Sequence, residues 1–162
     1  MHGLNAHVRR VVVRTLVDDV KPSIICLQQT KLDVISQFLI LSMLGRDFSD
    51  YAYLPASHTR GGILIAGRQS DVAFSDVLVG CYSITVLVSA HTQSVEEPRK
   101  WWLTVVYGPQ EDGDKVLFLE DLESIRDVCT GPWAVTSDFN LILNEADKSN
   151  DRIDRANLRR FR

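Results

Sequence analysis

The middle of the chain is a close succession of short apolar segments separated by turn-forming or charged residues. They run from Tyr51 to Leu54, Gly62 to Ala66, Val72 to Val79, Tyr82 to Ser89 and Trp101 to Tyr107. Segments of this length and composition are typical of strands, and their direct succession predicts antiparallel hairpins. A sheet buries at least one face, so this feature requires a layered fold with a second sheet or helices against it.

Helical spacing precedes these strands. Between Asn5 and Val20 the spacing predicts an amphipathic helix, with Asn5 placed to cap its first turn. Its apolar face would carry Val8, Val11, Val12, Leu16 and Val20. Lys21 and Pro22 end the pattern, and the apolar run from Ser23 to Leu27 predicts a strand buried on both faces. A helix followed by a buried strand indicates an α/β protein.

Two further helices and one more strand are predicted. Asp33 opens a helical pattern through Val34, Phe38, Leu41 and Leu44, and Gly45 is a suitable stop. A third helix is expected over about 114–128, with Val116, Leu119, Leu122, Ile125 and Val128 on one face. Trp133 to Thr136 predicts another buried strand, and the tail from Glu145 is polar and helical in part. No linker separates these elements, so residues 1–162 form one domain.

The charge balance restricts the kinds of partner. The chain has a net charge of −3 and a pI near 5.8, which argues against binding nucleic acid by general phosphate neutralisation. The basic residues cluster near both ends, at His7, Arg9, Arg10 and Arg14 and at Arg152, Arg155, Arg159, Arg160 and Arg162. Two interpretations stay open: solvated helix faces, or contacts with DNA.

The cysteines and the hydropathy indicate the compartment. Cys26, Cys81 and Cys129 are odd in number and widely separated, which does not suggest a disulfide framework or a zinc site. We expect a reducing, intracellular location, the nucleus included, although no targeting signal is recognisable. No run approaches the roughly 18 apolar residues of a membrane span, so no membrane association is expected.

Four short polar segments follow predicted strands. They are Leu27-Gln28-Gln29-Thr30-Lys31, Thr59-Arg60-Gly61-Gly62, Val106-Tyr107-Gly108-Pro109 and Ser137-Asp138-Phe139-Asn140. Strand ends are where α/β proteins build their sites, although each segment alone would more often be an ordinary loop. In extended backbone Asp138 and Asn140 would face the same side and approach one ligand. The alternative, which stays open, is that Asp138 caps the following turn.

The order and spacing of these segments resemble the endonuclease/exonuclease/phosphatase superfamily, and within it the domain of plant non-LTR (LINE-type) retrotransposons. The matching stretches are LQQTK, LPASHTRGGILIA, WWLTVVYGP, PWAVTSDFNLIL and DKSNDR. The resemblance implies a two-sheet α/β sandwich, DNase I-like, with its helices outside. It also implies that the domain is truncated at both ends, hence incomplete at its N- and C-terminal parts. We expect the core to include Cys26, Ile63, Ile65, Val86, Val105 and Val135.

The same resemblance implies roles for single residues. Asp138 matches the aspartate that orients or activates the attacking water, Asn140 the asparagine that holds the scissile phosphate, and Tyr107 a tyrosine near that phosphate. Gln29 stands where the family has a glutamate that binds the catalytic Mg²⁺ or Mn²⁺. An asparagine of the first strand and a Ser-Asp-His segment of the family are expected to fall outside this chain.

The departure at Gln29 lowers the expected activity. An amide carbonyl can bind Mg²⁺ but does not offset its charge, so we expect weak metal binding and little or no hydrolysis of DNA. Three alternatives remain: a working nuclease or phosphatase, a remnant that still binds DNA, and a protein-interaction module. Missing strands would also expose sheet edges, so we expect self-association, with Ser83 to Ser89 as the strand most at risk.

Overall fold

The computed structural model describes residues 4, 7–57, 61–91 and 98–141, with only the backbone of Ser137. Within them the helices are α1 (His7–Val20), α2 (Gln37–Met43) and α3 (Asp112–Val128). The strands are β1 (Ile24–Gln28), β2 (Asp50–Leu54), β3 (Ile63–Gly67), β4 (Val72–Val79), β5 (Ser83–Ala90), β6 (Lys100–Tyr107) and β7 (Trp133–Asp138). The predictions for Asn5, Thr59, Arg60, the tail from Glu145 and the C-terminal arginines lie outside the described residues.

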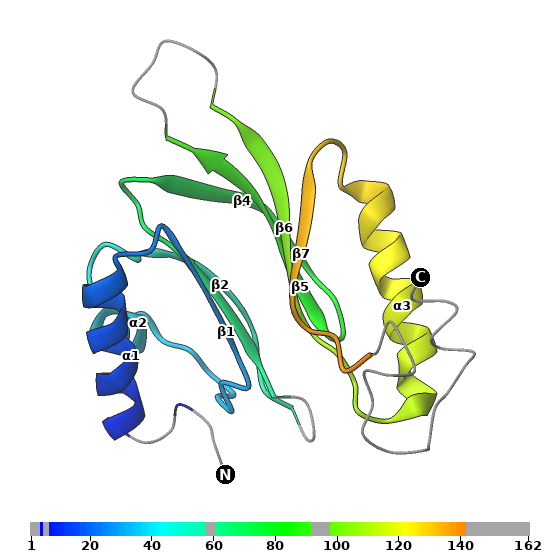
Figure 1. Cartoon of the computed structure of the whole chain (residues 1–162), viewed down its shortest axis with the longest axis horizontal. Helices are drawn as coiled ribbons and strands as arrows, with labels where there is room; N and C mark the ends of the chain where they lie inside the picture. The colour runs from blue at the N-terminus through cyan, green and yellow to red at the C-terminus, as the bar shows by residue number, and fades with distance from the viewer. Residues whose placement is uncertain (1–3, 5–6, 58–60, 92–97, 142–162) are drawn as a thin grey trace.

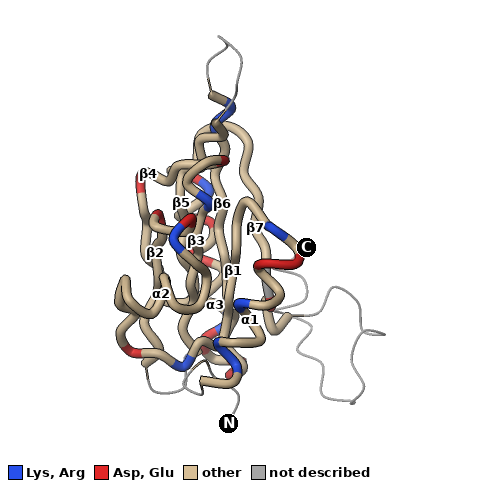
Figure 2. Tube along the Cα trace, turned by 90° about the vertical axis from the view of Figure 1, so that its left-hand side faces the viewer, with Lys and Arg blue, Asp and Glu red and all other residues tan. Residues whose placement is uncertain are grey.

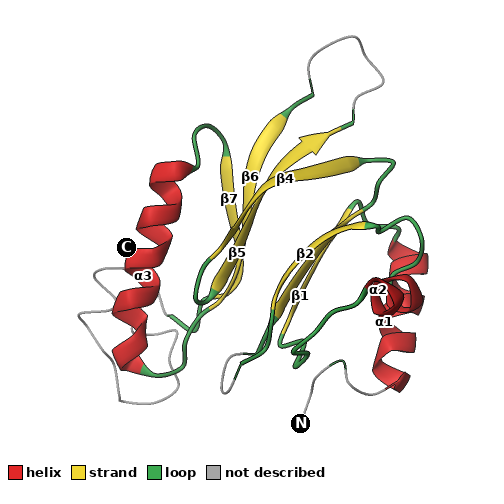
Figure 3. Cartoon of the chain, turned by 180° about the vertical axis from the view of Figure 1, so that it is seen from behind, coloured by secondary structure: helices red, strands yellow, loops and turns green. Residues whose placement is uncertain are grey.

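The elements form a sandwich of two sheets between two layers of helices (Figure 1). One sheet has three antiparallel strands in the order β1-β3-β2, and the other has four in the order β4-β5-β6-β7. β4, β5 and β6 form an antiparallel meander, whereas β7 returns parallel to β6 after the α3 crossover. Figure 3 shows α1 and α2 outside one sheet and α3 outside the other. This arrangement confirms the predicted two-sheet α/β sandwich.

Three apolar clusters fill the spaces between the four layers, and the middle one joins the two sheets. In that middle cluster Ile63, Ile65, Val86 and Val105 are buried as predicted. Cys26 and Val135 are only half-buried, which differs from the prediction. Both lie on edge strands, β1 and β7, where one side of the strand has no neighbour in its sheet.

The helix α1 forms where predicted, but its orientation does not match the prediction. Val17 is buried and Val13 packs beside it, whereas the five residues assigned to the packing face are exposed. The helix is apolar on more than one side, and only one side can contact the sheet. The spacing therefore predicted the helix correctly and its buried face wrongly.

The second helix begins later than Asp33. Ser36 caps it, because the Ser36 hydroxyl accepts a hydrogen bond from the Leu39 amide at 3.3 Å. As a result Val34 and Phe38 are exposed, and the buried face of α2 is Leu39, Ile40 and Met43. Gly45 follows the helix with φ +101°, as expected of a glycine stop. The third helix matches its prediction, except that Val128 at its end is exposed.

One strand prediction holds in part and one was wrong. Both faces of β1 contact apolar clusters, Ile25 and Leu27 on one side and Ile24 and Cys26 on the other, but β1 is an edge strand and only Ile25 in it is fully buried. The Ser83 to Ser89 segment is an interior strand paired on both sides, with β4 and with β6, so it is not an exposed edge. The edges of the larger sheet are β4 and β7, and a register shift between Ser75 and Leu78 interrupts the pairing of β4.

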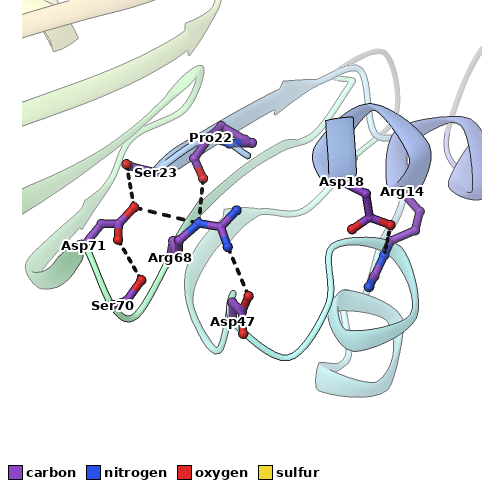
Figure 4. Close-up of polar contacts among 8 residues, drawn as sticks. All are labelled: Arg14, Asp18, Pro22, Ser23, Asp47, Arg68, Ser70 and Asp71. Carbon is purple, nitrogen blue, oxygen red and sulfur yellow. Dashed lines mark hydrogen bonds and ion pairs between the residues drawn. The ribbon is translucent and has the colours of Figure 1, made fainter. Parts of the chain in front are cut away.

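Arg68 organises the end of the sandwich where β1 begins and β3 ends (Figure 4). Its guanidinium donates to the Pro22 carbonyl at 3.1 Å and to the Asp47 carboxylate at 3.0 Å. Asp71 lies 3.7 Å from the same guanidinium. Hydrogen bonds from Ser23 and Ser70, more than the Arg68 charge, hold the pKa of Asp71 below its usual value. This network ties three chain segments together at the end of the sandwich away from the polar segments considered next.

Candidate functional site

Three of the four polar segments follow β1, β6 and β7, and these three strands end on the same side of the sandwich. Figure 1 shows the C-terminal ends of β1, β6 and β7 at the lower end of the molecule. Backbone hydrogen bonds link the segments there: Lys31 N to Gly61 O at 2.8 Å, and Gly108 N to Asp138 O at 2.8 Å. The described parts of the four polar segments therefore form one continuous cluster.

Gln29 and Tyr107 meet in this cluster. Gln29 follows β1 in a left-handed backbone conformation, with φ +50°. Its side-chain amide Nε2 donates to the Tyr107 hydroxyl oxygen at 2.8 Å. The neighbouring Gln28 donates from Nε2 to the Val106 carbonyl at 3.2 Å. Two consecutive glutamines thus connect the smaller sheet to the end of β6.

Gly61 makes this contact possible. A Cβ atom at Gly61 would lie 2.9 Å from Gln29 Cα and 3.0 Å from Tyr107 Cε1, closer than real Cβ atoms tolerate without a shift. The backbone of the segment after residue 60 therefore packs directly on both side chains. This close approach gives a physical reason for a glycine in that segment.

Asp138 and Asn140 lie on the other side of Tyr107. Tyr107 and Asp138 are register partners in the parallel pair β6–β7, and Asn140 Nδ2 donates to the Gly108 carbonyl at 2.5 Å. The Asn140 backbone amide donates to Asp138 Oδ1 at 3.0 Å, so Asp138 caps the turn that follows β7. Asn140 has φ +50° and lies outside the strand, so the alternation assumed for the two residues does not extend to it.

A pocket of about 340 Å³ opens beside Tyr107. Gln29 and Lys31 line it from beyond the end of β1, Tyr82 from just before β5, and Tyr107 from the end of β6. The 108–111 loop and Asp114 complete the lining. Asp138 and Asn140 are not among its lining residues. The structure therefore brings Gln29 and Tyr107 into one pocket, whereas the other two predicted residues are hydrogen-bonded to the Gly108 backbone and do not line it.

Sequence reasoning missed the pocket residues Tyr82 and Asp114, and it named Lys31 only as part of the segment after the first strand. The Tyr82 hydroxyl donates to Asp114 Oδ2 at 3.0 Å, which fixes the start of α3 against the start of β5. Tyr82 precedes β5 and Asp114 lies in the first turn of α3, and neither belongs to one of the four polar segments. No spacing in the sequence distinguished them from ordinary surface residues.

The predicted site residues offer few of the oxygen ligands that a divalent cation needs. Mg²⁺ prefers carboxylate oxygens, usually one or two together with water and substrate oxygens. Among the residues described, Asp138 supplies the one predicted carboxylate, it is exposed, and one of its oxygens already accepts the Asn140 amide. In the described ranges no group of three or more His, Cys, Asp or Glu side chains is placed to hold a metal. These residues do not by themselves form a good cation site.

Charge around the cluster is mixed. Figure 2 shows acidic and basic positions interspersed along the described chain. In the pocket, Lys31 is accompanied by Glu111 and Asp114.

No helix within the described residues has the length and apolar character needed to cross a membrane.

Comparison with solved structures identifies the fold. The human Nocturnin catalytic domain, solved with a bound sulfate anion, matches with a TM-score of 0.56 and 18% sequence identity, over 86% of this chain and 59% of that one. A humanized D. rerio TDP2 matches with a TM-score of 0.54 and 15% identity, over 86% and 60%. This chain has the DNase I-like fold. D. rerio TDP2 in complex with a single-strand DNA product also matches this fold, with a TM-score of 0.53 and 14% identity, over 83% and 54%.

The DNase I-like chain spans between 54% and 60% of the length of these three structures. At identities of 14% to 18% the likeness concerns the fold. No protein-family model matches the sequence. The search of curated proteins found no match either.

Proposed function

We propose that this chain is an endonuclease/exonuclease/phosphatase domain derived from a Mg²⁺- or Mn²⁺-dependent DNA phosphodiesterase, and that it has weak activity or none. The observation that carries the proposal is the Gln29–Tyr107 hydrogen bond. The resemblance assigns the metal-binding position to Gln29, and there a neutral amide donates to a phenol at 2.8 Å. A carboxylate at this position would attract a cation, whereas this amide offers only its carbonyl oxygen.

The DNase I-like fold and the clustering of the four polar segments support the superfamily assignment. The ordered motifs support a place in the plant LINE-type branch of the superfamily. DNA is the proposed ligand, by the resemblance and because one D. rerio TDP2 neighbour was solved with a single-strand DNA product.

The roles proposed for the site residues follow from their chemistry. Asp138 would orient a water with its carboxylate, Asn140 would contact the phosphate, and Tyr107 would lie beside it. Asn140 Nδ2 uses one of its two N–H groups for Gly108 O, and Asp138 accepts the Asn140 amide through Oδ1 alone, so each side chain keeps a group for a substrate.

The alternative is DNA binding or protein interaction without catalysis. One observation favours it. Ala134, Thr136 and Asp138 of β7 share a face with Leu103, Val105 and Tyr107 of β6, toward the space between the sheets, yet all three are exposed. Among the described residues, the strands of the smaller sheet pack mainly against β4, β5 and β6, so within this part of the chain the inner face of β7 and its edge are available to a ligand or to another strand. Self-association through such sheet edges belongs to this alternative.

A plasmid-nicking assay tests the proposal. The purified chain, with Mg²⁺ or Mn²⁺ in excess, should nick supercoiled DNA barely above the background of buffer alone. Asp138→Ala is the test variant, and Asp127→Ala, an exposed aspartate on α3, is its control. Robust nicking that Asp138→Ala abolishes and Asp127→Ala retains would show a working nuclease and refute the proposal.

Fluorescence anisotropy with a labelled duplex separates the proposed remnant from its alternative. DNA binding that falls with rising salt, without cleavage, would indicate a binding remnant. No binding at low salt, together with no cleavage, would favour a protein-interaction module. Binding and nicking are measured on one preparation. Circular dichroism of that preparation shows first whether the chain is folded.

A further inference from the structure

One face of α1 presents a row of apolar side chains to solvent. The exposed fractions are 72% for Val8, 49% for Val11, 63% for Val12, 59% for Leu16 and 63% for Val20. We call these five residues the α1 stripe. Four of them are spaced four residues apart, so they lie along one side of the helix. In Figure 1 α1 lies at the margin of the molecule, with the smaller sheet on its other side.

Among the described residues, the α1 stripe does not serve the packing of its own domain. The opposite side of α1 already does so through Val17, which is buried, and Val13, which packs beside it against the core. Nor does the stripe serve helix formation, because valine is a poorer helix former than alanine, leucine or lysine. Four exposed valines in a helix of 14 residues are therefore unfavourable unless something covers them.

The charges along α1 indicate what covers it. Its first half carries Arg9 and Arg10, and its last turn carries Asp18 and Asp19. This order opposes the helix dipole, since the first turn has no acidic residue and the last turn no basic one. Arg10 lies on the packing side, where its Nε is buried, so Arg9 is the basic residue on the stripe side. A helix of the same sequence lying antiparallel would place Arg9 near Asp19 at both ends, whereas a parallel one would place like charges together.

Asp18 already has a partner on its own helix. Arg14 Nε contacts Asp18 Oδ2 at 3.0 Å (Figure 4). Arg14 also packs on Gly45, on the side of α1 that faces the end of α2. That pair therefore lies away from the stripe, while Asp19 is exposed and falls within the angular range of the stripe on a helical projection.

We propose that the α1 stripe is the interface of a homodimer, in which α1 packs antiparallel on α1 of a second copy across a two-fold axis. Such an interface is self-complementary: Val8 of one copy lies near Val20 of the other, and Arg9 near Asp19. The stripe from residue 8 to residue 20 is about 18 Å long at the α-helical rise. A single helix pair covers less than the roughly 1,200–2,000 Å² of a stable complex, so the dimer is weak and reversible.

The proposal does not depend on the proposed function, and it differs from association through sheet edges. Sedimentation velocity of the full chain over a range of concentrations tests it. The unmodified chain should show a sedimentation coefficient that rises with concentration. Leu16→Glu should weaken dimerisation at least about tenfold, because it buries a charge at the centre of the interface. Val128→Glu, at an equally exposed apolar position on α3, should leave it unchanged.

A charge exchange tests the antiparallel arrangement. Arg9→Glu and Asp19→Lys should each weaken self-association, because each creates two like-charge contacts per dimer. An equimolar mixture of the two variants should recover it, since both contacts are then between opposite charges. Circular dichroism and a thermal transition equal to that of the unmodified chain show that every variant is folded.

Three outcomes would overturn the proposal. The first is a monomer at every concentration, which would assign the stripe to another occupant, such as a membrane surface or a different protein. The second is self-association that Leu16→Glu leaves unchanged, which would point to a sheet edge. The third is association that depends on Leu16 but is not weakened by Asp19→Lys, which would exclude the antiparallel pairing.

Discussion

Gln29 donates a hydrogen bond from Nε2 to the hydroxyl oxygen of Tyr107, 2.8 Å away, and this bond joins the end of β1 in one sheet to the end of β6 in the other. Both side chains are half-buried. The contact thus has two aspects, one structural and one chemical, which separate experiments can measure.

The structural aspect is tested by Tyr107→Phe. Removal of the hydroxyl leaves the Gln29 amide without its acceptor in a partly desolvated place, which should lower the free energy of unfolding by about 1 kcal/mol. Urea denaturation followed by circular dichroism measures the change. Tyr53→Phe, at another half-buried tyrosine, is the control. If the two variants lose equal stability, the Gln29–Tyr107 bond contributes nothing measurable.

The chemical aspect is tested by Gln29→Glu. A carboxylate supplies charge that the amide lacks, so affinity for Mg²⁺ or Mn²⁺ should rise by at least about tenfold in isothermal titration. Nicking of supercoiled DNA should remain near background, because only one part of the catalytic machinery has been restored. Gln110→Glu adds the same charge to the same pocket at an exposed position. An equal gain with Gln110→Glu would mean that general charge, and not the position of Gln29, governs metal binding.

Alanine substitutions at Gly108 and Gly113 test whether the backbone around Gly108 is tightly packed, with Gly113 as the control. A Cβ atom at Gly108 would overlap the Phe139 carbonyl, so Gly108→Ala should separate the 108 loop from the end of β7 and cost about 1–3 kcal/mol or more. At Gly113, in the first turn of α3, a Cβ atom meets nothing within 4 Å. Gly113→Ala should therefore stabilise the protein by up to about 1 kcal/mol. Thermal melting of both variants distinguishes them, and a tolerated Gly108→Ala would show that this approach is not tight.

The Cys26 thiol should make stability depend on alkaline pH. Burial raises the pKa of Cys26 from 9.0 to about 11. Above pH 9 the unfolded chain loses this proton while the folded chain retains it, so the contribution is complete below pH 9 and falls as the pH rises toward 11. The loss from this group amounts to at most about 2–3 kcal/mol.

Unfolding in urea at pH 8 and at pH 10, compared between the unmodified chain and Cys26→Ala, isolates that contribution. The variant should be less stable at pH 8 because of the cavity, yet lose less stability between the two pH values. Equal losses in both proteins would show that Cys26 is not buried in solution.

The succession of strands along the chain could be predicted from the sequence, whereas the buried faces of α1 and α2 could not. Runs such as Val72–Val79 are short, largely apolar and bounded by turn residues, which is typical of a strand. In α1, however, Val13 and Val17 offer a second apolar side, and a helical projection cannot decide between two such sides. At α2, the Ser36 cap shifted the start and turned Phe38 outward.

The candidate site was located by resemblance and not by physical reasoning from the sequence. The separation of 78 residues between Gln29 and Tyr107 hides their contact from any local pattern. The left-handed backbone of Asn140 removed the alternation that had placed its side chain beside that of Asp138. Tyr82 and Asp114 approach each other only because α3 packs across the end of β5.

The connectivity of the two sheets has a consequence for the order of folding. β2 pairs with β3, and β4, β5 and β6 pair in succession, so most strand contacts join neighbours along the chain and close short loops. The Gln29–Tyr107 bond instead closes a loop of 78 residues, and its entropic cost is met only after both sheets exist and dock. Hydrogen exchange or stopped-flow fluorescence should therefore detect the hairpins first and the polar cluster last. The cluster would exist only in molecules that have completed assembly.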